Sequence, residues 1–203
     1  MKIIAKLLIV CFLLGLVIWC TSVIADRRFL SQELIRLHVV ADSDDAADQQ
    51  VKLQVKDAVV SYLQMEMPGD MDTQQAKAWL QENLPQIQVV ANRELENTQQ
   101  TYSAAVSFAK EAFPTREYDT FTLPAGVYES LRITIGQGEG KNWWCVVFPS
   151  LCVSATTDGF ADTAAGAGFS DTLTDTLTGE EPYEIRFFFL DCLGWLENFL
   201  FWS

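Results

Sequence analysis

Histidine and basic side chains are scarce in this chain, and their scarcity argues against several classes of function. The 203 residues include one histidine, His38, and 14 lysines and arginines against 27 aspartates and glutamates. The formal net charge of −13 repels the phosphate backbone of nucleic acids and the headgroups of anionic lipids. A single histidine offers no paired-histidine spacing for zinc. We therefore expect no nucleic-acid partner and no metal site.

A glycine-rich segment, residues 136–142, has the composition of a phosphate-binding loop without its context. The segment reads GQGEGKN, so its lysine is followed by Asn142 rather than by serine or threonine. An apolar, strand-like run comes next, whereas a phosphate loop leads into the N-terminus of a helix. Glycine-rich turns between strands are common. We predict a turn here and no nucleotide cofactor.

Cysteine is sparse, with two residues in the N-terminal apolar segment and three beyond it. The five are Cys11, Cys20, Cys145, Cys152 and Cys192. The odd number beyond the apolar segment allows at most one internal disulfide and leaves a thiol over. Cys145 and Cys152 flank Pro149, and an exported location would permit a structural disulfide between them. Two separate buried thiols are the alternative.

The longest hydrophobic run lies at the N-terminus. Residues 7–24 contain no charged side chain and follow two lysines. This pattern is typical of an export signal, which we place at residues 1–25. Cleavage after Ala25 would release the chain, whereas retention would make residues 7–24 a membrane anchor, because the run is close to the minimum length of a spanning helix.

Residues 26–153 predict an α+β domain. Alternating or branched apolar residues predict strands at 34–40, 102–108, 118–123, 131–135 and 143–148. Apolar residues at helical spacing predict three helices between residues 46 and 97. Asp72 and Gln75 resemble a capping box before the second helix, and Pro85 suits the first turn of the third. We expect an antiparallel sheet of four to five strands, covered by two or three helices.

The composition changes after this domain. Residues 154–182 are mostly alanine, threonine, glycine and aspartate, which is typical of a flexible acidic linker. Hydrophobicity returns in residues 183–203, which predict a short strand followed by an amphipathic helix. This C-terminal element either docks onto the core or lies on a membrane, although its polar side lacks lysine.

The stretch from residue 125 to residue 153 organises the predicted sheet. Two apolar runs flank the glycine-rich turn, which predicts a central β-hairpin. Successive residues of a strand face opposite sides, so two adjacent tryptophans cannot both point into a one-sided core. An exposed tryptophan is typical of the energetic centre of an interface, and burial of both rings is the alternative. The candidate partner-binding residues at this hairpin are Trp143, Trp144, Tyr128, Glu129 and Arg132.

Two blocks of the sequence resemble the signatures of a known family. These blocks, IRLHVVADSDDAADQQVKLQVKDAV and VYESLRITIGQGEGKNWWCVVFPSLC, resemble the stage II sporulation protein R family. The resemblance implies a signalling protein, not an enzyme, that is exported from the forespore into the intermembrane space. It also implies a partner, a membrane-embedded aspartic protease, which the protein activates so that a precursor sigma factor is processed.

A small extracytoplasmic hydrolase is the competing interpretation. Cys145 could act as nucleophile with His38 as base and Asp42 as orienting carboxylate, or Asp42 and Glu129 could act as paired carboxylates. Cys145 lies within a predicted strand, however, rather than at a helix N-terminus, where a thiolate is stabilised. We therefore expect a partly buried histidine, no catalytic residues and no cofactor.

Overall fold

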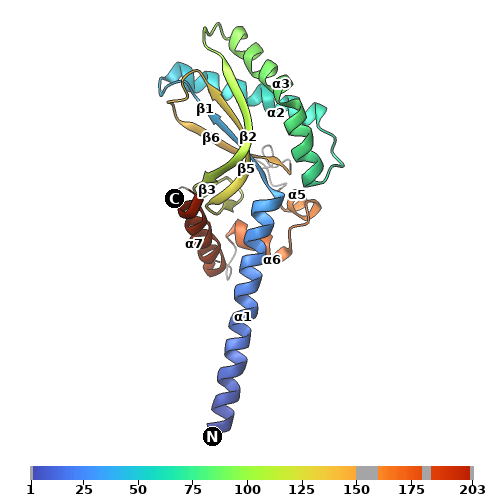
Figure 1. Cartoon of the computed structure of the whole chain (residues 1–203), viewed down its shortest axis with the longest axis vertical. Coiled ribbons are helices and arrows are strands. Elements are labelled where there is room, and N and C mark those ends of the chain that lie inside the picture. Colours follow the sequence, from blue (N-terminus) through green and yellow to red (C-terminus); the bar gives the residue numbers. More distant parts are fainter. Residues whose placement is uncertain (1, 150–159, 180–183, 202–203) are drawn as a thin grey trace.

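The computed structural model describes residues 2–149, 160–179 and 184–201. Within these residues the architecture is α+β, as predicted, with a four-stranded sheet and a long N-terminal helix that projects from the domain (Figure 1). The helices are α1 (Lys2–Glu33), α2 (Ala46–Glu66), α3 (Thr73–Asn97), α5 (Phe160–Gly166), α6 (Asp171–Thr178) and α7 (Glu184–Phe201). The strands are β1 (Ile35–Val40), β2 (Ala104–Phe113), β3 (Arg116–Glu117), β4 (Thr122–Leu123), β5 (Gly126–Ile135) and β6 (Asn142–Phe148).

Strand β1 lies inside the sheet, where all six of its residues are buried. The strand order is β2-β5-β1-β6. Strand β1 runs parallel to β5 and antiparallel to β6, while β2 and β5 are antiparallel. The sheet is therefore mixed rather than antiparallel throughout. The predicted central β-hairpin is wrong, because β1 is inserted between the two strands that were expected to pair.

The glycine-rich segment makes this insertion possible. Its residues cross the end of β1 and so span two strand spacings, about 10 Å, which a two-residue turn could not bridge. Two aspartates that follow β1 hold the crossing: Asp42 accepts a hydrogen bond from the Gln137 amide at 2.6 Å, and Asp44 accepts one from the Lys141 amide at 2.7 Å. A Cβ atom at Gly140 would lie 2.2 Å from the carbonyl oxygen of Ser43. Glycine is required there by close approach, not by a bound phosphate.

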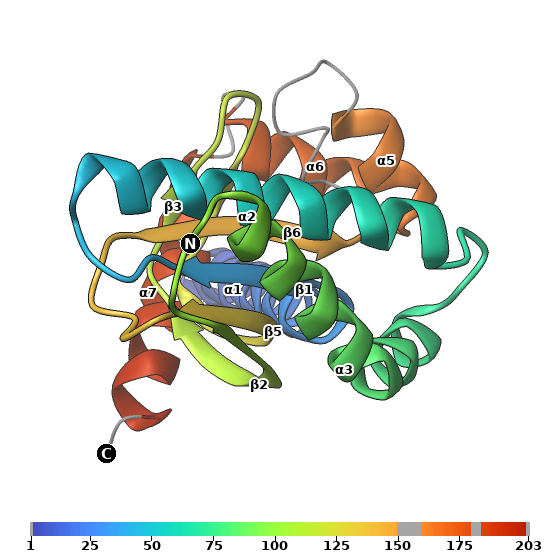
Figure 2. The ribbon, with the colours of Figure 1, turned by 90° about the horizontal axis from the view of Figure 1, so that it is seen from above.

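Helices α2 and α3 cover one face of the sheet (Figure 2). The predicted capping box at α3 is confirmed, since the Asp72 carboxylate accepts from the Gln75 amide and the Gln75 side chain accepts from the Asp72 amide, both at 2.8 Å. The predicted break at Pro85 is absent, and α3 is one helix. Leu80 and Ile87, on either side of the proline, are both fully buried, so continuous packing outweighs the lost backbone hydrogen bond.

The opposite face carries a second core, to which residues 160–179 contribute. Phe160, Phe169, Leu173 and Leu177 are all buried there, so the described part of the predicted flexible linker is folded. Three of these residues recur every fourth position, which gives a short amphipathic face. The predicted strand at the start of the C-terminal element is also wrong, because helix α7 begins at Glu184.

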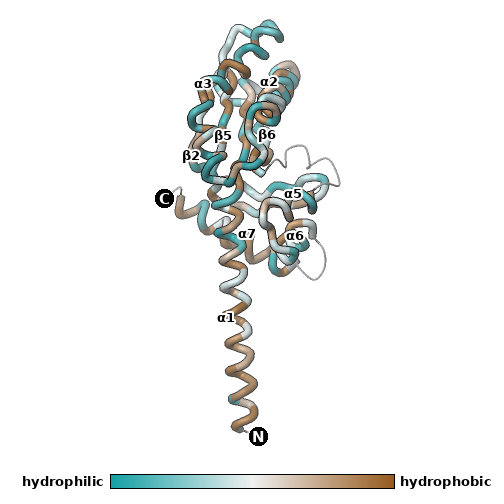
Figure 3. The backbone as a smooth tube through the Cα atoms, turned by 90° about the vertical axis from the view of Figure 1, so that its right-hand side faces the viewer, coloured by the Kyte–Doolittle hydropathy of each residue, from teal (hydrophilic) through white to brown (hydrophobic). Residues whose placement is uncertain are grey.

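The end of α1 belongs to this second core as well. Val23 and Leu30 are buried, and α1 continues as one helix from the apolar segment into the domain. The helix is hydrophobic along most of the part that projects (Figure 3). Residues 3–33 form a helix long and apolar enough to cross a membrane, and few residues of its most apolar part are buried. This finding fits either export or membrane anchoring.

Candidate functional site

The two adjacent tryptophans point to opposite faces of β6. Trp143 is exposed, and its ring lies 5.1 Å from the ammonium nitrogen of Lys56 on α2. Trp144 is half-buried on the other face, where its ring stacks on His38 with centroids 3.8 Å apart. The register of the sheet explains this contact, because His38 pairs with Trp144 across β1 and β6. On the Trp144 face, aromatic and charged side chains meet around His38.

A hydrogen-bonded network on that face joins all four strands of the sheet. His38 Nδ1 lies 3.2 Å from Glu111 Oε2, and His38 Nε2 lies 2.9 Å from Asn142 Oδ1. Arg132 Nη1 donates to Glu111 Oε1 at 2.8 Å. Which ring nitrogen donates depends on the tautomer of His38, and Nδ1 is the donor in a hydrogen bond with the Glu111 carboxylate. The network thus places Glu111 between two donor side chains.

The electrostatics of Glu111 favour its charged form. Burial of the carboxyl raises its pKa, but hydrogen bonds from His38 and Arg132, with the Ser130 hydroxyl nearby, lower the pKa to about 2. Glu111 is therefore a carboxylate at neutral pH. Its charge fixes the guanidinium of Arg132 in one orientation at the surface, where 40% of the Arg132 side chain is exposed.

The sheet around this network is open on the β2 side. Ala105, Ser107 and Ala109 alternate along β2 toward the same face and are all exposed. Small side chains leave the neighbouring Arg132 accessible. We call the surface formed by Ser107, Ala109, Glu111, Arg132 and Trp144 the open sheet face. It offers a cation, a carboxylate, an aromatic ring and small residues for contact with a partner.

A buried arginine lies next to the open sheet face. Arg36 on β1 is fully buried, with its guanidinium 4.3 Å from the centre of the Phe113 ring and its Nη2 donating to the Tyr118 hydroxyl at 2.7 Å. Its Nε and Nη1 atoms have no hydrogen-bond partner in the part of the chain that the structure describes. The aromatic rings stabilise this cation from the side of the core.

The structure brings together only some of the residues predicted from the sequence. Trp144 and Arg132 share the open sheet face, whereas Glu129 and Trp143 lie on the face that α2 and α3 cover. Tyr128 is fully buried, and its hydroxyl donates to the Pro124 carbonyl at 2.8 Å, so it is not accessible to a partner. Which of the accessible residues contact a partner stays a prediction.

Sequence reasoning missed Glu111 and Asn142 and considered His38 only as a buried residue or a base. Each of the three lies on a different strand, and their contacts depend on the insertion of β1 between β5 and β6. The alternation of β2 could have marked Glu111 as a charged residue on a partly covered face. No local signal identified its partners.

The residues proposed for a hydrolase do not assemble. Cys145 lies on the opposite face of the sheet from His38 and is disulfide-bonded; Cys152, its predicted partner, lies outside the described residues. Asp42 accepts the Gln137 amide in the glycine-rich crossing. Glu129 pairs in register with Ile35, seven residues before Asp42, so the two carboxylates are about 23 Å apart along the strand. Neither combination can share a substrate.

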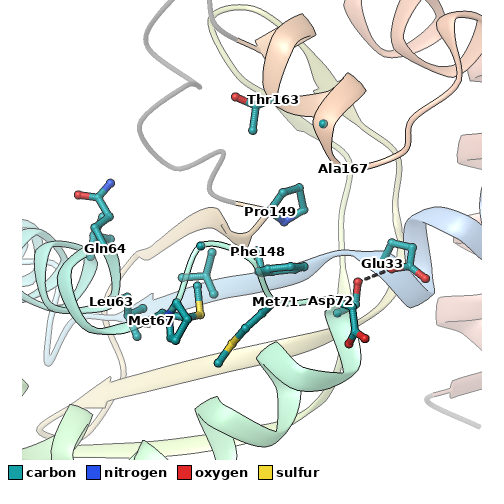
Figure 4. Close-up of a pocket in the computed structure, with 16 residues that line it drawn as sticks. Glu33, Leu63, Gln64, Met67, Met71, Asp72, Phe148, Pro149, Thr163 and Ala167 are labelled. Carbon is teal, nitrogen blue, oxygen red and sulfur yellow. Dashed lines mark hydrogen bonds between the residues drawn. The ribbon is translucent and has the colours of Figure 1, made fainter.

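A cavity of about 630 Å³ lies beside the end of β6, away from the open sheet face (Figure 4). Met67, Met71, Phe148 and Pro149 give it apolar walls, and Glu33 and Asp72 lie at one side. Methionine-rich surfaces adapt to varied apolar side chains.

Among the described residues no cluster of three or more histidine, cysteine or acidic side chains suits a metal ion.

Comparison with known proteins identifies the family. The family described as stage II sporulation protein R matches residues 31–158. The stage II sporulation protein R of Bacillus subtilis (strain 168) is 36% identical over 132 residues, which are 65% of this chain and 59% of that protein. The chain thus spans little more than half the length of this curated relative. No solved structure matches. The matched region contains the whole sheet, and the chain belongs to the stage II sporulation protein R family.

Proposed function

We propose that this chain is an exported signalling ligand that activates a membrane-embedded aspartic protease, which then processes a precursor sigma factor. Family membership supports the role in sporulation. The single observation that supports action by binding is the open sheet face, where Glu111 holds Arg132 in a fixed and accessible position beside Trp144. This arrangement has the features of a recognition surface rather than of a catalytic centre.

Activation requires that the ligand bind the active form of the protease more tightly than the inactive form. Arginine and tryptophan are the residues that most often dominate the binding energy of an interface. Arg132 is held by Glu111 before any partner arrives, which lowers the entropy lost on binding. A partner surface that presents a carboxylate to the free donors of Arg132 and an apolar group to Trp144 would match the open sheet face.

The location we propose is the intermembrane space, on the surface of the membrane that α1 crosses. Retention of α1 is favoured over cleavage after Ala25, because residues on both sides of that bond pack against the domain. Val23 is buried in the second core, and the Ser22 hydroxyl accepts from Arg186 at 2.7 Å. Cleavage would remove these contacts. An anchored ligand meets a membrane-embedded partner by diffusion in two dimensions.

The test is to replace Arg132 with alanine and to measure processing. The chain, the candidate protease and the sigma precursor are produced together in a heterologous host, and the cleaved fraction of the precursor is quantified. We expect R132A to lose about 2 kcal/mol or more of binding free energy, as hot-spot arginines do, and to reduce processing accordingly. The matched control is Lys110→Ala, which removes an exposed cation from the same pair of strands without altering the network.

Two further measurements make the result decisive. Urea unfolding of the purified variants shows whether R132A remains folded. Affinity capture of the protease by the tagged chain shows whether binding itself is lost. A folded R132A chain that captures and activates the protease as well as K110A does would exclude the open sheet face as the recognition surface.

A further inference from the structure

Helix α7 exposes a face that is wholly apolar. Among residues 185–201 the side chains most open to solvent recur at helical spacing and none of them is charged. They include Ile185, Phe188, Cys192, Trp195, Leu196 and Phe199. A surface helix normally turns its apolar stripe toward the core and its charges toward water. Helix α7 has the reverse arrangement, so water is not the medium that its outer face suits.

Three charged side chains of α7 are paired with the domain or with α1 instead. Arg186 donates to Asp26 of α1, Glu197 pairs with Arg27 of α1, and Asp191 accepts from the Ala125 amide at 2.8 Å. These contacts hold α7 against α1 and β5. The polar side of α7 is thus bound to protein, which removes the need for lysines that would otherwise contact headgroups.

Helix α1 supplies a scale for depth in a membrane. The exposed cations Lys6 and Arg28 bracket 21 residues, 7–27, which span about 32 Å at the rise of an α-helix. The hydrocarbon core of a bilayer is about 30 Å thick. Within this span the two charges, Asp26 and Arg27, lie at the domain end and are both paired with α7.

The contacts between the helices place α7 on this scale. Phe189 meets Trp19 edge to face, with ring centroids 5.0 Å apart, and Trp19 lies nine residues, about 13 Å, below Arg28. Glu197 lies at the level of Arg27. Helix α7 therefore extends along α1 from the level of Arg27 to the level of Trp19. In Figure 1, α7 lies on the side of the domain from which α1 projects.

We propose that the apolar face of α7 is embedded in the domain-side leaflet of the same bilayer that α1 crosses, an inference that rests on the anchored location proposed above. The apolar surface of α7 is continuous with that of α1, so one lipid phase covers both. Binding is driven by burial of apolar side chains and needs no anionic lipid. The two helices together would fix the tilt of the domain, and with it the height of the open sheet face above the membrane.

Native cysteines allow a direct test with the full chain. Cys192 lies in the middle of the apolar face of α7, and Cys11 lies in the apolar part of α1, five residues from Lys6. Variants that keep one of the two, in a background with Cys20→Ser, are labelled with an environment-sensitive fluorophore and placed in phosphatidylcholine vesicles. The lipids carry bromines, which quench the fluorophore, either near the headgroup or near the middle of the acyl chain.

We expect the probes at Cys192 and at Cys11 both to be quenched, because each lies inside the hydrocarbon span that the length of α1 defines. The control is Met65→Cys, an exposed position on α2, which is expected to escape both. Labelling of the chain that lacks Cys11, Cys20 and Cys192 gives the background from any other thiol. Leu196→Glu, which places a charge on the exposed face, is expected to reduce quenching at Cys192 and to leave Cys11 unchanged.

The two probes separate failure of this proposal from failure of the anchored location. If Cys11 is quenched but Cys192 behaves as Met65→Cys does, the bilayer does not cover α7, and a protein partner becomes the remaining occupant of its apolar face. If Cys11 itself is not quenched and the chain fails to float with the vesicles, the anchored location is wrong. Processing of the sigma precursor is measured separately and bears on neither result.

Discussion

The two adjacent tryptophans of β6 should differ sharply in their contribution to stability. Trp144 stacks on His38, meets the Phe113 ring edge to face at 4.8 Å and lies 5.2 Å from the guanidinium carbon of Arg116. Each aromatic contact contributes about 0.5–1.5 kcal/mol beyond burial, and an exposed cation–π contact contributes about 0.5–1 kcal/mol. Because W144A also removes the buried surface of the ring, it should lower the free energy of unfolding by about 3 kcal/mol, within the range for truncated core tryptophans. Among the described residues Trp143 makes a cation–π contact with Lys56 and no aromatic ring contact, so W143A should lower the free energy of unfolding by about 1 kcal/mol or less.

Urea unfolding of the detergent-solubilised chain, followed by circular dichroism, measures this difference. A difference of about 2 kcal/mol corresponds to a midpoint about 1 M lower for W144A than for W143A at a typical urea dependence for a domain of this size. The wild-type chain and both variants must show the same slope for the midpoints to be compared. Equal midpoints for the two variants would refute the assignment of the Trp144 ring to a packed environment and of the Trp143 ring to an exposed one.

Two further predictions concern acid stability and the segment after β6. The pKa of Glu111 in the folded chain, about 2, lies below its ordinary value of 4.5, so this carboxylate contributes stability above pH 4.5 that is lost as the pH falls toward 2. We therefore expect E111Q to be less stable than wild type at neutral pH and to approach the stability of wild type in acid. If the difference between their urea unfolding midpoints does not become smaller from pH 6 to pH 3, this expectation is contradicted. Phe160→Ala removes a buried ring that stacks on Phe121 with centroids 4.1 Å apart, and it should lower the free energy of unfolding by about 3–5 kcal/mol. A urea unfolding midpoint equal to that of wild type within error would show that residues 160–179 do not stabilise the domain.

The parts of the fold that could be predicted are those specified by local signals. The capping box at Asp72, the helical spacing of α2 and the branched residues of β1 act within a few residues of each other. The insertion of β1 between β5 and β6 joins segments about 100 residues apart in the sequence. A glycine-rich turn between two apolar runs is compatible with a hairpin and with a crossing, and only the docking of Asp42 and Asp44 decides between them.

After Val153 the composition predicted a flexible linker where the described residues are folded. Alanine, threonine and aspartate dominate residues 160–179, yet a few large apolar side chains are enough to attach two short helices to a core that other elements have formed. In α7 the alternation of Ile185 and Phe187 with charged residues fitted a strand as well as a helix. Its exposed apolar face follows from ion pairs with α1, and their partners are about 160 residues away.

The candidate site was predicted only in part, because local sequence signals do not identify contacts between distant segments. Trp144 and Arg132 lie in one local segment, and strand alternation was sufficient to suggest that such residues could be exposed. Glu111 and Asn142 acquire their roles only through the register of the completed sheet. The orientation of Arg132 depends on Glu111, which accepts its hydrogen bond.

Site-specific crosslinking to the protease tests the central claim most directly. A photoreactive amino acid replaces Ser107, in the middle of the open sheet face, or Val89, an exposed residue of α3 on the other side of the domain. Each chain is produced with the protease and the sigma precursor, and precursor processing shows that it remains active. If the open sheet face binds the protease, position 107 forms a crosslink to the protease and position 89 forms none. A crosslink from position 89 and none from position 107 would contradict the central claim.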